Sequence, residues 1–133
     1  MRADTQTISI EAPPDKIVRF LSNGANLPRW AVGFAKSVAA ANDGWRVTTG
    51  GGEVHLRIDR DDSTGVVDFL MAPAPGVEML AASRVIPRGR ASEVVFTQFQ
   101  GPEMTDEMFE KSIQAVSHEL RVLKGILEVE CPL

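Results

Sequence analysis

Apolar and polar residues alternate near the start of the chain, which predicts a first strand. Over residues 5–11, Ile8 and Ile10 fall on one face. Pro13 and Pro14 end this pattern because proline fixes φ and lacks an amide donor. Pro14 also suits the first turn of a short helix that reaches residue 21, and residues 25–30 predict a second helical piece or a loop.

The centre of the chain predicts an antiparallel meander. Between residues 36 and 100 the apolar period is two, and turns rich in Gly, Pro, Asn and Asp recur at short intervals. These connections are too short for the crossover that parallel strands need. Six strands fit the pattern, at about 36–41, 44–49, 53–59, 65–71, 77–86 and 91–99.

The period changes after Pro102, where the spacing predicts one long amphipathic helix to about Glu128. Thr105 is a good N-cap, and Asp106 and Glu107 complement the helix dipole. Apolar residues then recur at intervals of three and four. The whole order predicts an α+β fold, in which a curved, seven-stranded antiparallel sheet wraps around the C-terminal helix, with two short helices after the first strand.

Composition narrows the function classes. The 133 residues carry 14 Lys and Arg against 18 Asp and Glu, and we expect one domain over 1–133. Cys131 is the single cysteine, which excludes an internal disulfide and a cysteine-based metal site. With only two separated histidines, we expect no metal and no cofactor. The basic residues are scattered and no long apolar run occurs, so we expect a cytoplasmic protein without a nucleic-acid partner or membrane insertion.

The sequence resembles the START/SRPBCC superfamily, the helix-grip fold shared with birch-pollen-type allergens and the polyketide cyclase/dehydrase group. The resemblance spans nearly the whole chain. The matching segments are TISIEAPPDKIVRFL at 7–21, NLPRW at 26–30, GVVDF at 65–69, SRVIPRGRASEVVFTQF at 83–99 and TDEMFEKSIQAVSHELRVLKGILE at 105–128. It implies a hydrophobic cavity between the sheet and the C-terminal helix, and related folds often form homodimers, which we also expect here.

Strand parity indicates which residues would face such a cavity. Among the polar candidates, Ser83 and Gln98 share the apolar face, whereas Arg84 and Thr97 do not. We expect two turns, Gly50–Gly52 and Pro73–Gly76, at the cavity mouth. The predicted ligand-binding residues are Trp30, Phe34, Trp45, Val54, Leu56, Phe69, Met71, Met79, Ser83, Phe96, Gln98, Met108, Phe109, Ile113 and Val116. The same apolar positions also fit a filled core.

His55 and Asp68 are the candidate catalytic residues. Parity places both on the polar face of the sheet, and two short-loop registers put either His55 or Arg57 opposite Asp68. A histidine–carboxylate pair could transfer a proton, but it could equally be a solvated ion pair on the convex face.

Three function classes follow. The first is binding of a small hydrophobic or amphipathic ligand, such as a lipid, aromatic or polyketide-like molecule. The second is a polyketide cyclase/aromatase-like enzyme, which the resemblance supports through the fold only. The third is a protein-interaction module with a filled core.

Overall fold

The computed structural model describes residues 1–133 and contains one seven-stranded antiparallel sheet in the order β1-β7-β6-β5-β4-β3-β2. The first and last strands in sequence are therefore neighbours, and the rest form a meander. The strands are β1 (Ala3–Ile10), β2 (Ser37–Ala41), β3 (Gly44–Thr49), β4 (Gly52–Asp61), β5 (Val66–Ala74), β6 (Val77–Arg88) and β7 (Ala91–Phe99). This confirms the predicted fold class.

Three short helical segments connect β1 to β2. They are α1 (Pro14–Ser22), the 3-10 turn η1 (Gly24–Asn26) and α2 (Leu27–Trp30). Pro14 occupies the first turn of α1 as predicted, and Ile17, Val18 and Leu21 turn inward. Asn23 stops α1 and caps η1, because its side chain accepts a hydrogen bond from the Ala25 amide at 3.1 Å.

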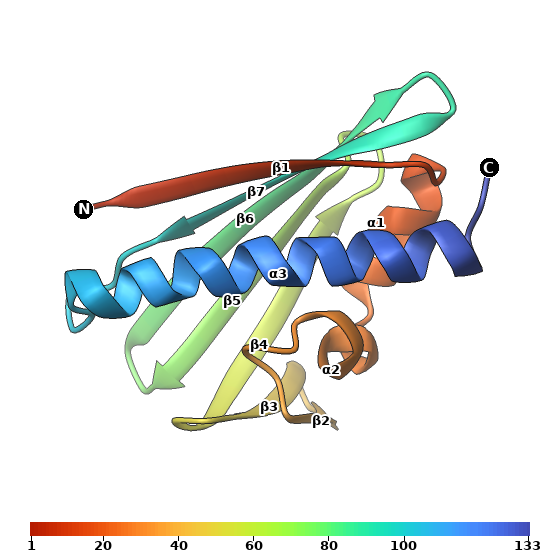
Figure 1. Ribbon diagram of the computed structural model, residues 1–133. Coiled ribbons are helices and arrows are strands. Elements are labelled where there is room, and N and C mark those ends of the chain that lie inside the picture. Colours follow the sequence, from red (N-terminus) through yellow and green to blue (C-terminus); the bar gives the residue numbers. More distant parts are fainter.

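The long C-terminal helix α3 (Asp106–Glu130) crosses one face of the sheet (Figure 1). Thr105 caps it, since its side chain accepts a hydrogen bond from the Met108 amide at 3.2 Å. Figure 1 also shows α2 beside α3, on the same face of the sheet. None of the helices combines the length and apolar character of a membrane span.

One continuous core holds these layers together. It unites residues of all three helices with the inward positions of β1 and β3–β7. On α3 the most deeply buried stripe comprises Phe109, Leu120, Leu123 and Leu127. Burial of this stripe sets the rotation of α3 about its own axis, and therefore decides which other residues of α3 face the interior.

The predicted pairing of His55 or Arg57 with Asp68 is wrong. Asp68 lies opposite Asp59, while His55 lies opposite Ala72. The physical reason is the hairpin turn, which takes residues 62–65 and shifts the register beyond both short-loop alternatives. The Asp61 carbonyl accepts a hydrogen bond from the Gly65 amide at 2.9 Å, and this bond closes the longer turn.

Candidate ligand-binding cavity

A cavity of about 280 Å³ lies between the sheet, α3 and the segment around α2. Sixteen of its 21 lining residues are hydrophobic. The sheet contributes β4 to β7, the four strands that run through its middle, and α3 contributes its N-terminal half. The interior is therefore not completely filled, contrary to the alternative of a solid core.

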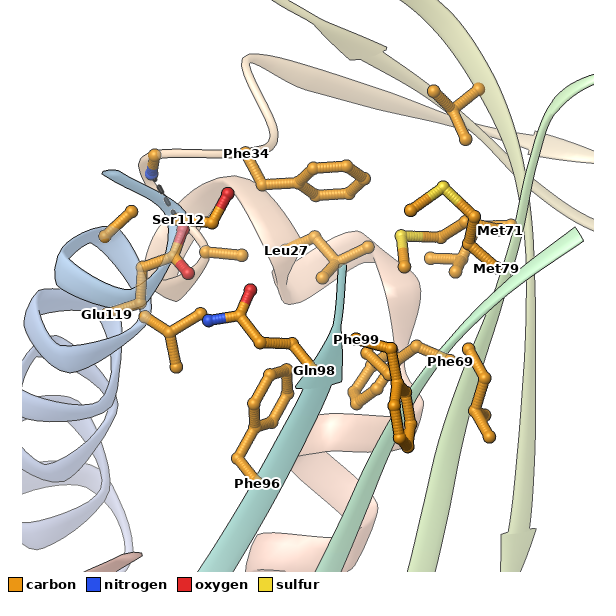
Figure 2. A pocket seen from close by; sticks show the side chains of 18 of the residues that line it. Leu27, Phe34, Phe69, Met71, Met79, Phe96, Gln98, Phe99, Ser112 and Glu119 are labelled. Carbon is orange, nitrogen blue, oxygen red and sulfur yellow. Dashed lines mark hydrogen bonds between the residues drawn. The ribbon is translucent and has the colours of Figure 1, made fainter. Parts of the chain in front are cut away.

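Aromatic rings and methionines form the apolar wall. The ring centroids of Trp30 and Phe69 are 6.2 Å apart, and those of Phe69 and Phe96 are 6.3 Å apart. Tilted pairs at this separation are favourable and hold one another in place. Met71 and Met79 lie next to Phe69 on the sheet side of the cavity, across from Ser112 and Glu119 of α3 (Figure 2). Flexible thioether side chains can adapt to differently shaped ligands.

Glu119 places a carboxyl group in this apolar wall. The residue is only 6% exposed, and its Oε2 accepts a hydrogen bond from the Gly33 amide at 2.9 Å. Burial raises the pKa of Glu119 to about 7, although backbone hydrogen bonds from Gly33 and Phe34 act in the opposite direction. The group therefore exchanges its proton near neutral pH.

Two further polar groups in the wall have no hydrogen-bond partner. They are the indole Nε1 of Trp30 and the amide Nε2 of Gln98, both buried donors. Figure 2 shows the Gln98 side chain extending from β7 toward Glu119 on α3. We call Trp30, Gln98 and Glu119 the polar trio. Unpartnered buried donors are uncommon in folded proteins, so a pair in one cavity is notable.

Ten of the fifteen residues predicted to bind a ligand lie in the cavity wall. They come from α2, the sheet and α3, as strand parity and helical spacing indicate. These ten are Trp30, Phe34, Val54, Leu56, Phe69, Met71, Met79, Phe96, Gln98 and Val116.

The other five lie elsewhere. Trp45 packs over Gly24, and Ser83 is buried but donates its hydroxyl to the Val67 carbonyl at 2.6 Å. On α3, Met108 is exposed, Phe109 is buried outside the cavity under the Arg2 guanidinium, and Ile113 does not reach the wall.

Helix rotation explains the errors on α3. Of the four residues of α3 predicted to bind the ligand, only Val116 lines the cavity, and the other lining residues of this helix are Ser112, Ala115 and Glu119. These three residues are small or polar, so hydrophobicity does not mark them. Their spacing of three and four along the helix is the one signal in the sequence that places them on a common face.

Further lining residues lie outside the predicted ligand-binding set. Pro73 belongs to the segment 73–76, which the sequence places at the cavity mouth, and it does line the cavity. The others are Leu27, Ala31, Gly33, Leu80, Ala81, Phe99 and Met104. The Gly50–Gly52 turn does not line the cavity, so its expected place at the mouth is wrong.

The catalytic candidates lie on the other face of the sheet. The His55 side chain is exposed, as alternation predicts, and neither it nor Asp68 lines the cavity. Asp59, which faces Asp68, pairs with Arg57 at 3.3 Å. The interpretation as solvated charges on the convex face fits these contacts, and the polar trio replaces His55 and Asp68 as the chemically distinctive group.

Comparison with known proteins agrees with the fold. Residues 1–124 match the family described as polyketide cyclase / dehydrase and lipid transport. The chain belongs to this family. Its membership is consistent with hydrophobic ligand binding, and no curated protein matches the sequence significantly.

Solved structures similar to this family member share its fold along nearly the whole chain. XoxI from Bacillus cereus is 20% identical with a TM-score of 0.75, and the match covers 98% of this chain and 99% of that one. The Aha1 dimer from Colwellia psychrerythraea is 21% identical with a TM-score of 0.75, covering 97% and 98%. The Zhui aromatase/cyclase from Streptomyces sp. R1128 is 18% identical with a TM-score of 0.75, covering 97% and 96%.

Proposed function

We propose that this protein binds a small, mainly apolar ligand in the cavity between the sheet, α2 and α3. The preformed cavity carries the proposal, because a void of about 280 Å³ lined mostly by apolar side chains leaves dispersion contacts unmade. A ligand would make those contacts and would lose apolar surface to water, which contributes roughly 25 cal/mol per Å². Membership in a family that includes lipid transport supports the same function.

Native mass spectrometry of the freshly purified protein tests this proposal directly. We expect a bound small molecule, or, for a protein purified empty, binding of added bicyclic aromatic compounds. A cavity-filling variant supplies the control. Ser112→Phe places a ring in the cavity wall, whereas Gln114→Phe adds the same ring on the exposed side of α3.

The two variants separate cavity binding from surface binding. We expect Ser112→Phe to lose most of the ligand affinity and Gln114→Phe to retain it. Equal binding by both variants would place the ligand outside the cavity. If the wild-type protein carries no small molecule and binds no bicyclic aromatic compound, the proposed function is refuted.

Proton transfer is a second candidate function, and Glu119 is the observation that favours it. A carboxyl group with a pKa of about 7 in an apolar cavity suits general acid–base catalysis near neutral pH. The carboxylate would remove a proton from the carbon next to a ligand carbonyl, leaving an enolate, and then return a proton to the same carbon.

Deuterium exchange measures this reaction without any co-reactant. In D2O the protein should accelerate exchange of the hydrogens adjacent to the carbonyl of a bicyclic ketone, as followed by proton NMR. Glu119→Gln should reduce the exchange rate to the uncatalysed level while ligand binding persists. An unchanged rate in this variant would exclude Glu119 as the base.

A further inference from the structure

We propose that Gln98 Nε2 and Trp30 Nε1 form a subsite for an acceptor oxygen, and that the ligand is a neutral, mainly apolar molecule with a carbonyl group. This inference rests on the proposed function of ligand binding in the cavity. It goes beyond that function, because it assigns the two donors a role and names the chemical class of the ligand.

The two unpartnered donors indicate that the ligand carries a hydrogen-bond acceptor. Both nitrogens are buried, and neither has a protein partner. A buried donor without a partner loses its hydration and gains nothing in return, so it destabilises the empty protein. A carbonyl oxygen has two acceptor lone pairs, so it can accept a hydrogen bond from each of these nitrogens. Trp30 and Gln98 line the same cavity, from α2 and β7.

The charge of the cavity wall indicates that the ligand is neutral. The 21 lining residues include no Lys, Arg or His, and Glu119 is the only ionisable one among them. A carboxylate ligand would find no cation in the cavity and would be repelled by the ionised form of Glu119. The wall therefore favours neutral ligands over fatty acids and other anions.

The volume of the cavity limits the size of the ligand. A dry protein cavity of about 150 Å³ is known to hold one benzene ring. The volume here, about 280 Å³, is close to twice that. We therefore expect a ligand of about two fused rings. The ketone 1-tetralone meets all three requirements, and tetralin is the same bicyclic skeleton without the oxygen.

Calorimetric titration of both compounds tests the subsite. We compare the wild-type protein with Gln98→Leu, which removes the amide and keeps a similar volume, and with Trp30→Phe, which removes the indole donor and keeps an aromatic ring. Gln114→Leu is the matched control, since it makes the same chemical change on the exposed side of α3. The measured quantity is the ratio of the two dissociation constants.

The preference for the ketone should depend on the two donors. One neutral hydrogen bond changes affinity by roughly three- to tenfold, so each variant should lower the preference for 1-tetralone over tetralin by about that factor. Tetralin affinity should be unchanged or higher in Gln98→Leu, and Gln114→Leu should behave like the wild-type protein. A preference that is equal in the wild-type protein and both donor variants would overturn the inference.

Infrared spectroscopy gives a readout that a purely structural effect would not produce. The carbonyl stretch of bound 1-tetralone should lie at lower frequency than in an alkane solvent, and Gln98→Leu should move it back toward the alkane value. An alkane-like frequency in the wild-type complex would also overturn the inference. Binding of both compounds without preference refutes the subsite alone, whereas binding of neither compound refutes the proposed function as well.

The Glu119→Gln variant tests whether the cavity selects against anionic ligands. The anion 1-naphthoate has the same size, and at pH 8 it should bind the wild-type protein at least tenfold more weakly than 1-tetralone. Glu119→Gln should reduce this difference by removing the like charge. Tight naphthoate binding by the wild-type protein would contradict the neutral ligand class.

Discussion

Glu119 is a buried carboxyl group whose desolvation is unfavourable for stability and whose position favours a functional role. Its carboxyl lies in an apolar wall and accepts a hydrogen bond from the Gly33 amide, but no charged side chain contributes to its pKa. The nearest cation on the packed segment α2 is Arg29, which is paired with Glu130 near the other end of α3. Keeping an uncompensated carboxyl in this position favours a functional role over a stabilising one.

The stability of the protein should fall as pH rises from about 4.5 to about 7 because of Glu119. In this window the unfolded chain has released the proton, whereas the folded protein, with a pKa of about 7, retains it. Glu119→Gln keeps an acceptor for Gly33 but cannot ionise. We expect this variant to gain stability relative to the wild-type protein by about 3 kcal/mol between these pH values.

Urea unfolding at several pH values measures this difference. The gain should be absent near pH 4.5, grow with pH and level off above pH 7. A difference between the two proteins that does not change with pH would show that Glu119 titrates normally in the folded state.

Gly24 is a position where the absence of a side chain matters. A Cβ atom at residue 24 would lie 2.4 Å from the Trp45 ring, far inside van der Waals contact. Gly24→Ala must therefore displace the indole, and we expect a loss of about 1 to 3 kcal/mol in the free energy of unfolding. Chemical denaturation checks this value, and Gly125→Ala, where no atom lies within 4 Å, is the control. A loss below about 0.5 kcal/mol for Gly24→Ala, the range of an ordinary surface substitution, would mean that Trp45 is mobile.

At the scale of elements, α3 performs two tasks with two adjacent stripes. Leu120, Leu123 and Leu127 pack into the core, whereas Ser112, Ala115 and Glu119 border the cavity. The first stripe can be recognised in the sequence because burial requires apolar side chains. The second cannot, because a wall that only borders a void tolerates small and polar residues.

The β4–β5 hairpin shows how a turn determines which residues meet. Gly65 has φ +77°, and a Cβ atom there would lie 2.1 Å from the Val85 carbonyl oxygen. We expect Gly65→Ala to destabilise the protein by about 2 kcal/mol or more, from backbone strain and the clash together.

Gly50→Ala is the matched control for this turn. Gly50 belongs to the turn between β3 and β4 and has no positive φ, and a Cβ atom there would have no neighbouring atom within 4 Å. Thermal unfolding should show a loss for Gly65→Ala and little change for Gly50→Ala. Equal midpoints for the two variants would contradict the tight contact between Gly65 and β6.

At the scale of the whole molecule, the fold does not depend on a ligand in the cavity. The core that holds α3 on the sheet is continuous beside the cavity, so the empty protein is complete as a fold. A ligand that binds only the folded state should add stability according to its concentration, by about 2.7 kcal/mol at 100 times its dissociation constant. We expect 1-tetralone to raise the melting temperature of the wild-type protein and not that of Ser112→Phe. A similar rise in both proteins would indicate binding outside the cavity.

Local patterns in the sequence are enough to predict the elements, their order and the fold class. Alternation in the strands, the proline at the start of α1 and the Thr105 cap are local signals, since each depends on neighbours along the chain. Strand parity also places Phe69, Phe96 and Gln98 on the inner face of the sheet.

The cavity and its polar groups, in contrast, arise from tertiary packing. The rotation of α3 brings Glu119 inward, the hairpin turn separates His55 from Asp68, and packing leaves the donors of Gln98 and Trp30 without partners. Each of these outcomes depends on contacts between segments far apart in the sequence. A pattern along one strand or helix shows which face is apolar, but it does not show where two apolar faces fail to meet.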